Sequence, residues 1–452
     1  MASKNVKRFF TLFALGITYG FMYVMPYMKS SFYDQMIAAM QVSNAQLGAL
    51  MTFYTIALTI SYLPGGWIAD RIRPKKVLLI SVFGQAALSF LFVFTYSNYT
   101  MAVIIWILMA LTGGFAFWPA LLKGIRMLGT NKEQGRLFGI FTGLNNLASL
   151  LLSFIMIGIL TLIGRADPVF GFQGAVASMG VLAIIAGLLL LFLFDDKDGS
   201  PATPTAPAVA AGEGKLEASA APAGAAIPAA QAAPPAQTPA PGQAASRFTI
   251  KPFLDTFKLP GVWLMTGMVW CYVTMMAVIS YLTPYSTSVL GISAGLAASI
   301  GIIRNYGVAL IGGPLGGIVA DKVVRSVSKQ QVIGMALCAA SLLFFILVPS
   351  GASAILLIVM ILFAGTSLFF CKGTAFSVQA ELGIPTSVSA SAVAIATLVG
   401  YLPDVFVHTM FGNFLDSFGN AGYQFIFLYG LAMALLGIVI ALIAHKVSKR
   451  LM

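Results

Sequence analysis

Twelve long apolar runs, separated by short polar breaks, constrain this chain more than any other feature of its sequence. Most of them reach about 20 residues, the length at which an α-helix crosses the roughly 30 Å hydrocarbon layer of a bilayer. Charged residues make up only 9% of the 452 residues, where a soluble protein has about 25%. The sequence therefore predicts an all-α integral membrane protein with twelve transmembrane helices.

The runs divide into two sets of six. We predict a first six-helix bundle in residues 1–196, a second in residues 251–452, and between them an Ala- and Pro-rich linker in residues 197–250. The linker has too few large apolar side chains to offset its ordering entropy, so it is predicted to be a disordered cytosolic tether. The helices are expected at roughly residues 9–33, 45–69, 76–96, 100–127, 137–163 and 172–194, and at 260–288, 293–320, 331–349, 353–378, 387–412 and 421–444.

The positions of the cations predict the orientation of the chain. Of the 26 Lys and Arg residues, five lie within predicted helices, and only Arg165 falls on the outer side if the N-terminus is cytosolic. This is a strong positive-inside bias, and it accounts for the net charge of +12 without a nucleic-acid partner. We predict a multi-pass protein of the cell inner membrane, with the lipid bilayer as its partner, both termini cytoplasmic, and a monomeric state.

The residues that carry enzyme chemistry are not found in a recognisable arrangement. The three cysteines, Cys271, Cys338 and Cys371, lie within apolar runs and lack the paired spacing of a zinc site or a disulfide framework. The chain also lacks a nucleotide-binding loop of the Gly-x-x-x-x-Gly-Lys-Ser/Thr type. We predict no enzyme activity, no cofactor and no metal. A membrane enzyme or lipid-handling protein that acts on anionic head groups is the weaker alternative.

One polar turn occurs in both halves of the chain. The first copy reads Gly66-x-x-x-Asp70-Arg71-x-x-Pro74-Lys75-Lys76, and the second, about 250 residues later, reads Gly317-x-x-x-Asp321-Lys322. Two copies of one turn, each after the second helix of its half, indicate a duplicated membrane protein with pseudo-symmetric bundles. The turn resembles the signature loop of the major facilitator superfamily, and the helix count and central linker extend the resemblance over nearly the whole chain. The resemblance implies the major facilitator fold.

The same resemblance implies a role for the loop. In that family its acid and cations make charge contacts between helix ends on the cytosolic side, and these contacts hold the outward-facing state together. By position, this role of a conformational latch falls to Asp70, Arg71, Asp321 and Lys322. Charges at the ends of surface helices contribute about 0.3 to 1 kcal/mol each, so several of them together make an adequate latch.

Two other stretches resemble transporters of organic anions. Tyr19-Gly20, Tyr23 and Lys29-Ser30-Ser31-Phe32 are similar to the organophosphate and organic-anion antiporter branch, in which a cation stands at about the position of Lys29. The stretch from Trp118 to Lys123, followed by Arg126, resembles enteric sugar-sulfonate permeases. Both resemblances imply a small organic anion as the substrate.

Ionisable residues within the predicted helices indicate the same substrate class. Each costs about 2.5 to 3.5 kcal/mol on insertion scales, and such residues usually face a cavity or a partner. They comprise five cations and one firm carboxylate, namely Lys29, Lys123, Arg126, Arg304, Lys372 and Asp404. Structural ion pairs would roughly cancel in sign. The surplus therefore favours a water-filled central cavity whose counter-charge arrives with the substrate.

We predict that the substrate-binding residues are Arg304, Lys372, Lys123, Lys29, Tyr23, Tyr19 and Asn145. Arg304 is the best candidate because counting along the eighth helix places it near the midplane, and a guanidinium binds a carboxylate, phosphate or sulfonate bidentately. Three alternatives stay open: snorkelling of Lys29 to the interface, ordinary packing of the tyrosines, and an interhelical contact of Asn145.

Asp404 and His408 are one helical turn apart, so their side chains point the same way. We predict that they couple transport to protons. The alternatives are a static ion pair between Asp404 and Arg304, and a solvated His408 near the outer surface. The predicted function is secondary active transport of a small organic anion by alternating access, as proton symport or anion exchange. The alternative function is a transporter-like receptor that binds the anion and signals without net transport.

Overall fold

The computed structural model of this chain describes residues 2–114, 117–129, 134–164, 167–195, 256–348, 352–385 and 388–451. Within these ranges the regular secondary structure is entirely helical. The predicted linker, residues 197–250, lies outside the described residues. The prediction of an all-α fold is confirmed.

The first half contains α1 (Ala2–Val24), η1 (Met28–Ser30), α2 (Tyr33–Met40), α3 (Asn44–Arg71), α4 (Pro74–Thr95), α5 (Tyr99–Gly114), α6 (Phe117–Met127), α7 (Gln134–Ile163) and α8 (Pro168–Leu193). The second half contains α10 (Pro260–Ser280), α11 (Leu282–Ser288), α12 (Ala294–Ile302), η3 (Ile303–Gly307), α13 (Ala309–Ile318), η4 (Val319–Val323), α14 (Val327–Leu347), α15 (Ala354–Lys372), η5 (Ala375–Gln379), α16 (Ser389–Gly400), α17 (Pro403–Phe418), η7 (Gly419–Ala421) and α18 (Gly422–Leu451).

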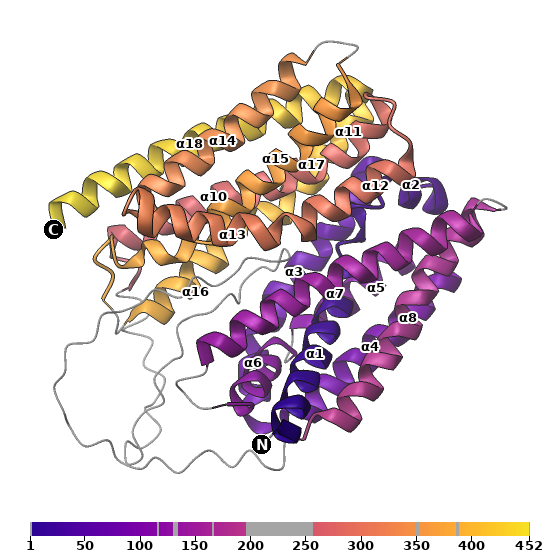
Figure 1. Cartoon of the computed structure of the whole chain (residues 1–452). Coiled ribbons are helices and arrows are strands. Elements are labelled where there is room, and N and C mark those ends of the chain that lie inside the picture. Colours follow the sequence, from indigo (N-terminus) through magenta and orange to yellow (C-terminus); the bar gives the residue numbers. More distant parts are fainter. Residues whose placement is uncertain are drawn as a thin grey trace.

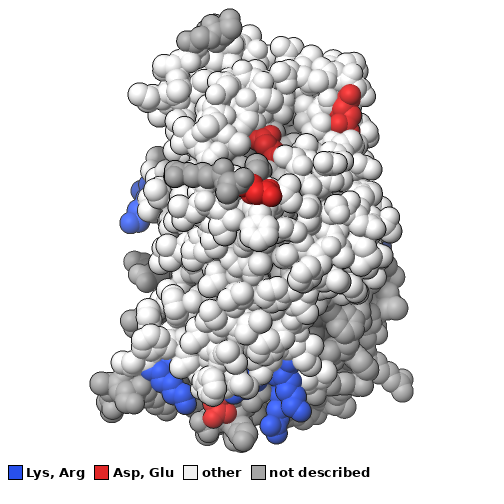
Figure 2. All heavy atoms as spheres, turned by 90° about the vertical axis from the view of Figure 1, so that its right-hand side faces the viewer, with Lys and Arg blue, Asp and Glu red and all other residues white. Residues whose placement is uncertain are grey.

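Large apolar side chains cover the outside of the bundles. Ile80, Phe94, Phe192 and Ile355 are each at least 70% exposed. Patches of this kind are rare on soluble proteins, and in a helical bundle of this length they are the surface that meets lipid. On the face that Figure 2 shows, charged side chains are few, and the described Lys and Arg residues gather mainly at one end. The molecule is a multi-pass membrane protein.

The first helix ends earlier than the sequence pattern predicted. α1 stops at Val24, whereas the apolar run suggested a helix to about residue 33. The cause is Pro26, which lacks the N–H that a continuing helix needs and whose ring clashes with the preceding turn. The indole of Trp106 donates a hydrogen bond of 3.1 Å to the Pro26 carbonyl and so holds the bent segment. As a result the chain at Lys29 turns toward the second half.

Two helices of the second half are also irregular at their centres. Residues Ile303–Gly307 form a π-helical turn between α12 and α13, a feature that often marks a functional site. The helix expected at residues 387–412 breaks between α16 and α17, where Pro403 occupies a first-turn position that suits proline. The break places Asp404 in the first turn of α17, where the helix dipole favours a carboxylate.

The two halves meet near α2, α3 and α12, and the N and C termini lie at the opposite end of the molecule (Figure 1). The main contact joins α3 to α17. A Cβ atom at Gly48 would lie 2.2 Å from the carbonyl oxygen of His408, and one at Gly412 would lie 2.3 Å from that of Asn44. Only glycine allows the two backbones to approach so closely at these positions.

Hydrogen bonds between the halves reinforce this contact. The hydroxyl of Thr287 donates to the carboxylate of Asp34 at 2.8 Å, and Gln35 donates to the carbonyl of Ala294 at 3.2 Å. Burial raises the pKa of the Asp34 carboxyl, while the hydrogen bond from Thr287 acts in the opposite direction. The halves are therefore joined by both packing and polar contacts at the end remote from the termini.

Candidate functional site

A cavity of about 80 Å³ lies between the two halves. It has room for several water molecules. Residues of α1, η1, α3, α10, η3, α15 and α17 contribute to its wall. Its charged and titratable lining includes Lys29, Arg304, Asp404 and His408, and Tyr23 lies beside them. Five residues that were selected from the sequence thus line one cavity.

Lys29 is the contribution of the first half to the charged lining. Its side chain is only 4% exposed, and its Nζ lies 3.0 Å from Nδ1 of His408. It also donates to the hydroxyl of Tyr281 at 3.4 Å and stands 4.9 Å from the centre of that ring. An ammonium group has only donors, so Nδ1 of His408 accepts this bond. The alternative that Lys29 snorkels to the interface is wrong.

Asp404 and His408 lie on the same face of α17, as their spacing indicated. Nε2 of His408 is 3.8 Å from a carboxylate oxygen of Asp404. Both side chains are buried, so the alternative of a solvated His408 is wrong. Because Lys29 donates to Nδ1, the ring proton of a neutral His408 is on Nε2, facing Asp404. Lys29, His408 and Asp404 therefore form a chain of contacts across the two halves.

Arg304 is almost completely buried, with 1% of its surface exposed. Its Nη2 donates to the backbone carbonyl of Ser30 at 2.9 Å and to Oδ1 of Asn305 at 3.2 Å, and its Nε reaches the same Oδ1 at 3.3 Å. Its Nη1 is buried without a hydrogen-bond partner. Among the residues that the structure describes, no ion pair joins Arg304 to Asp404, so the static pair between them is wrong for this state.

Lys372 and Lys123, two further predicted binding residues, differ in burial. Lys372, at the end of α15, is buried; its Nζ lies 5.5 Å from the ring centre of Phe369, and it is within electrostatic range of Asp404. Lys123, on α6, is exposed. Neither belongs to the described residues that line the cavity. Their roles in binding stay predictions.

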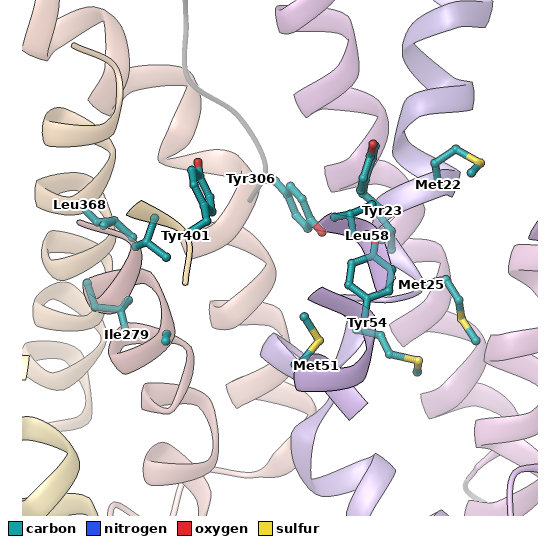
Figure 3. Packing of buried hydrophobic residues seen from close by; sticks show 14 of the residues in the cluster. Met22, Tyr23, Met25, Met51, Tyr54, Leu58, Ile279, Tyr306, Leu368 and Tyr401 are labelled. Carbon is teal, nitrogen blue, oxygen red and sulfur yellow. The ribbon is translucent and has the colours of Figure 1, made fainter. Parts of the chain in front are cut away.

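Three tyrosines line the cavity, Tyr23 and Tyr27 from the first half and Tyr306 from the second. Tyr19 and Tyr23 pack with ring centres 4.7 Å apart. Tyr306, two residues after Arg304 in η3, points toward α1 and α3 in Figure 3. Asn145 is buried in α7, where it accepts a long bond of 3.5 Å from Ser149, and it lies outside the lining. The cavity thus has an aromatic wall beside its charged one.

Ser30 and Tyr281 were missed in the sequence. The carbonyl of Ser30 binds Arg304, and the hydroxyl of Tyr281 donates to the carbonyl of His408 at 2.9 Å while it accepts from Lys29. Pro26 predicts irregular backbone after the first helix, but nothing in the sequence singles out the Ser30 carbonyl. Tyr281 carried no signal either.

Of the predicted latch residues, Asp321 and Lys322 are not part of the cavity lining. Asp321 and Lys322 are exposed in η4. The side chains of Asp70 and Arg71, at the end of α3, lie outside the described part of the chain. The latch stays a prediction.

Comparison with solved structures identifies the fold. The chain superimposes on a bacterial homologue of the human lysosomal transporter Spinster, in its inward-facing and unoccupied conformation, with a TM-score of 0.70 and 14% identity over 98% of this chain and 97% of that one. It also matches FucP, a major facilitator superfamily transporter in the outward conformation, with a TM-score of 0.55 and 14% identity over 96% and 98% of the two chains.

Comparison with known sequences agrees with the comparison of structures. The chain is 24% identical to the inner membrane protein YihN of Escherichia coli (strain K12), covering 100% of this chain and 98% of that protein. It is also 24% identical to the inner membrane protein YqcE of the same strain, over 97% and 95% of the two chains. The family model described as Major Facilitator Superfamily matches residues 9–408. The chain belongs to the major facilitator superfamily, and it is a transporter.

Proposed function

We propose that this transporter carries a small organic anion by secondary active transport, and that the anion binds between the halves at Arg304. The observation that carries this proposal is the buried, unpartnered Nη1 of Arg304, a residue that lines the cavity. A buried donor without a partner is costly, and a charged one more so. An anionic oxygen that enters the cavity would satisfy it.

The charge balance around the cavity supports an anion. Lys29, Arg304 and Lys372 are buried cations, whereas Asp404 is the one buried carboxylate among the described residues, within electrostatic range of the two lysines. A buried cation that lacks its counter-charge is strongly destabilising. A phosphate, sulfonate or carboxylate group on the substrate would supply that charge, and the neighbouring Tyr23 and Tyr306 hydroxyls would bind the body of the molecule.

Alternating access is the mode of transport that the fold serves. We place both termini in the cytoplasm and the protein in the inner membrane, on the positive-inside bias of the sequence. With that orientation, the joined end of the two halves faces outward, and the structure corresponds to an inward-facing state. Opening of the contact between α3 and α17 would then admit substrate from outside.

For coupling we propose the chain Lys29, His408 and Asp404. The bond from Lys29 to Nδ1 requires a neutral imidazole, so a proton that adds to His408 breaks a contact between the halves. The charged and titratable groups that face His408 are Asp404, Lys29 and Tyr281, and Lys372 acts on Asp404. Proton binding would thus be linked to opening of the outer end. The alternative is exchange of one anion for another without protons, and the experiment must distinguish it from proton-coupled transport.

The test uses purified protein in proteoliposomes. A thermal-unfolding screen of phosphorylated, sulfonated and carboxylated metabolites identifies a ligand, because a ligand at about 100 times its dissociation constant adds about 2.7 kcal/mol to apparent stability. Counterflow of that ligand is then measured in the wild type, Arg304→Ala and Lys372→Ala. We expect exchange in the wild type and its loss in both variants. Binding without counterflow would instead indicate a receptor, and unchanged exchange in both variants would reject the cationic site.

A further inference from the structure

The backbone carbonyl of Ser30 has an unusual pair of partners. It accepts a hydrogen bond of 2.9 Å from Nη2 of Arg304 and another of 2.9 Å from the hydroxyl of Thr283. Ser30 belongs to the first half of the chain, and both donors belong to the second. A carbonyl has two lone pairs, so this one is fully used by contacts between the halves. The Ser30 carbonyl is therefore part of what closes the outer end.

The same bond removes a donor from the anion site. Arg304 has five N–H donors. Nε and Nη2 both face Oδ1 of Asn305, and the remaining hydrogen of Nη2 points to the Ser30 carbonyl. Only Nη1 is left without a partner. In this state Arg304 can therefore offer one nitrogen to an anion, although a free guanidinium edge offers two parallel donors.

We propose that the transported anion and the Ser30 carbonyl compete for Nη2 of Arg304. The inference rests on the proposed anion site at Arg304. When the outer end is closed, the anion is held through Nη1 alone; when the two halves separate there, Nη1 and Nη2 together bind two oxygens of one phosphate, sulfonate or carboxylate group. The contact that closes the outer end thereby weakens the hold on the substrate and favours its release on the other side.

Asn305 is the positioning residue of this arrangement. Its Nδ2 donates to the hydroxyls of Ser30 and Ser31, at 2.9 and 3.2 Å, while its Oδ1 accepts from Arg304. Both ends of the amide are thus occupied, and its orientation follows from its partners. Asn305 holds one edge of the guanidinium and leaves the edge formed by Nη1 and Nη2 to the Ser30 carbonyl or to the anion.

The proposal implies a reciprocal effect. A ligand that binds one state more tightly shifts the equilibrium toward that state by the same factor. One charge-assisted hydrogen bond corresponds to roughly a tenfold difference in affinity or more. At saturating concentration, anions with several oxygens should therefore raise the population with an open outer end about tenfold. Chloride, a single atom, should not.

The experiment measures this opening directly. Spin labels are attached to two introduced cysteines, Ser97→Cys between α4 and α5 and Ala354→Cys at the start of α15. Both positions are exposed. The three native cysteines are buried, so they are expected to react poorly with the label. Label separation is followed while inorganic phosphate, methanesulfonate or acetate replaces chloride at constant ionic strength. We expect a growing population with a larger separation. Thermal unfolding under the same conditions reports anion binding independently.

Two variants separate the possible results. Arg304→Gln removes the guanidinium, so the open population of this variant, whatever its size in chloride, should not respond to the anion. Thr283→Val removes the other bond to that carbonyl and leaves Arg304 intact, so its open population should rise even in chloride and rise further with the three anions.

Three results would overturn the proposal. If the anions stabilise the wild type but not Arg304→Gln, and yet leave the label separation unchanged or shorten it, the anion site stands and the competition is wrong. If the open population grows equally in the wild type and Arg304→Gln, the effect does not pass through the guanidinium. If none of the three anions stabilises the wild type, the anion site of the proposed function fails, and the competition fails with it.

Discussion

The carboxylate of Asp416, at the end of α17, accepts hydrogen bonds from both the backbone N–H and the side-chain amide of Asn44, at 2.9 and 2.8 Å. Its second oxygen accepts from the backbone N–H of Ala45 at 2.8 Å. Asn44 begins α3, whose first N–H groups have no partner within the helix. A residue of the second half therefore caps a helix of the first, and this cap is part of the contact that joins the halves at the end remote from the termini.

Loss of this cap should open the outer end. Removal of a capping side chain costs about 0.5 to 2 kcal/mol, which corresponds to about a 2- to 30-fold change in an equilibrium. We expect Asp416→Ala to increase the open population by a factor in this range, measured by the spin-label separation between positions 97 and 354. Asp416→Asn keeps one acceptor oxygen and should have a smaller effect. Equal separations in Asp416→Ala and the wild type would contradict the role of the cap.

Gly412→Ala should also open the outer end, in this case through a steric clash. The added Cβ would lie 2.3 Å from the carbonyl oxygen of Asn44, and a backbone atom cannot move aside as a side chain can. Gly412→Ala should therefore drive α3 and α17 apart and enlarge the same separation. Gly143→Ala, in α7, is the matched control, because its Cβ would have no neighbour within 4 Å. An effect of similar size in both variants would show that the close approach is not responsible.

Asp404→Asn should separate exchange from coupling. If Asp404 takes and releases the transported proton, the variant should retain counterflow, which needs no net proton movement, and lose accumulation driven by an acidic exterior. In the wild type, accumulation should rise as the external pH falls, because the gradient then drives protons inward with the anion. The measurement is uptake at several imposed pH gradients. A wild-type pH dependence in the variant would make Asp404 a structural residue.

Glu381 should matter for stability rather than for transport. Its carboxylate accepts hydrogen bonds from the backbone N–H groups of Val327 and Ser328, the second at 3.0 Å, so it caps the start of α14 from a later segment. We expect Glu381→Ala to lower the free energy of unfolding by about 0.5 to 2 kcal/mol, seen as a lower melting temperature. Glu381→Gln should lose less. Counterflow by the folded fraction should be unchanged in both, and a selective loss of counterflow would indicate a role in the transport cycle.

Much of the fold followed from local sequence properties. Apolar runs of about 20 residues predict helices because every span must satisfy its own backbone hydrogen bonds in lipid. The repeated turn that begins at Gly66 and Gly317 pointed to the duplication and to the family. The spacing of Asp404 and His408 placed both on one face of α17, as the structure confirms.

The composition of the site depended on contacts that no local pattern contains. Lys29 lies 379 positions before His408 and reaches it only because Pro26 ends α1 and turns the chain toward the second half. A static pair of Arg304 with Asp404 was one of the alternatives, but Nη2 of Arg304 binds the carbonyl of Ser30 instead. By itself the sequence determined the helical membrane class and pointed to the family. The tertiary structure decided which of those charges meet, because helix breaks and the close approach of two glycine-containing helices set the distances between the halves.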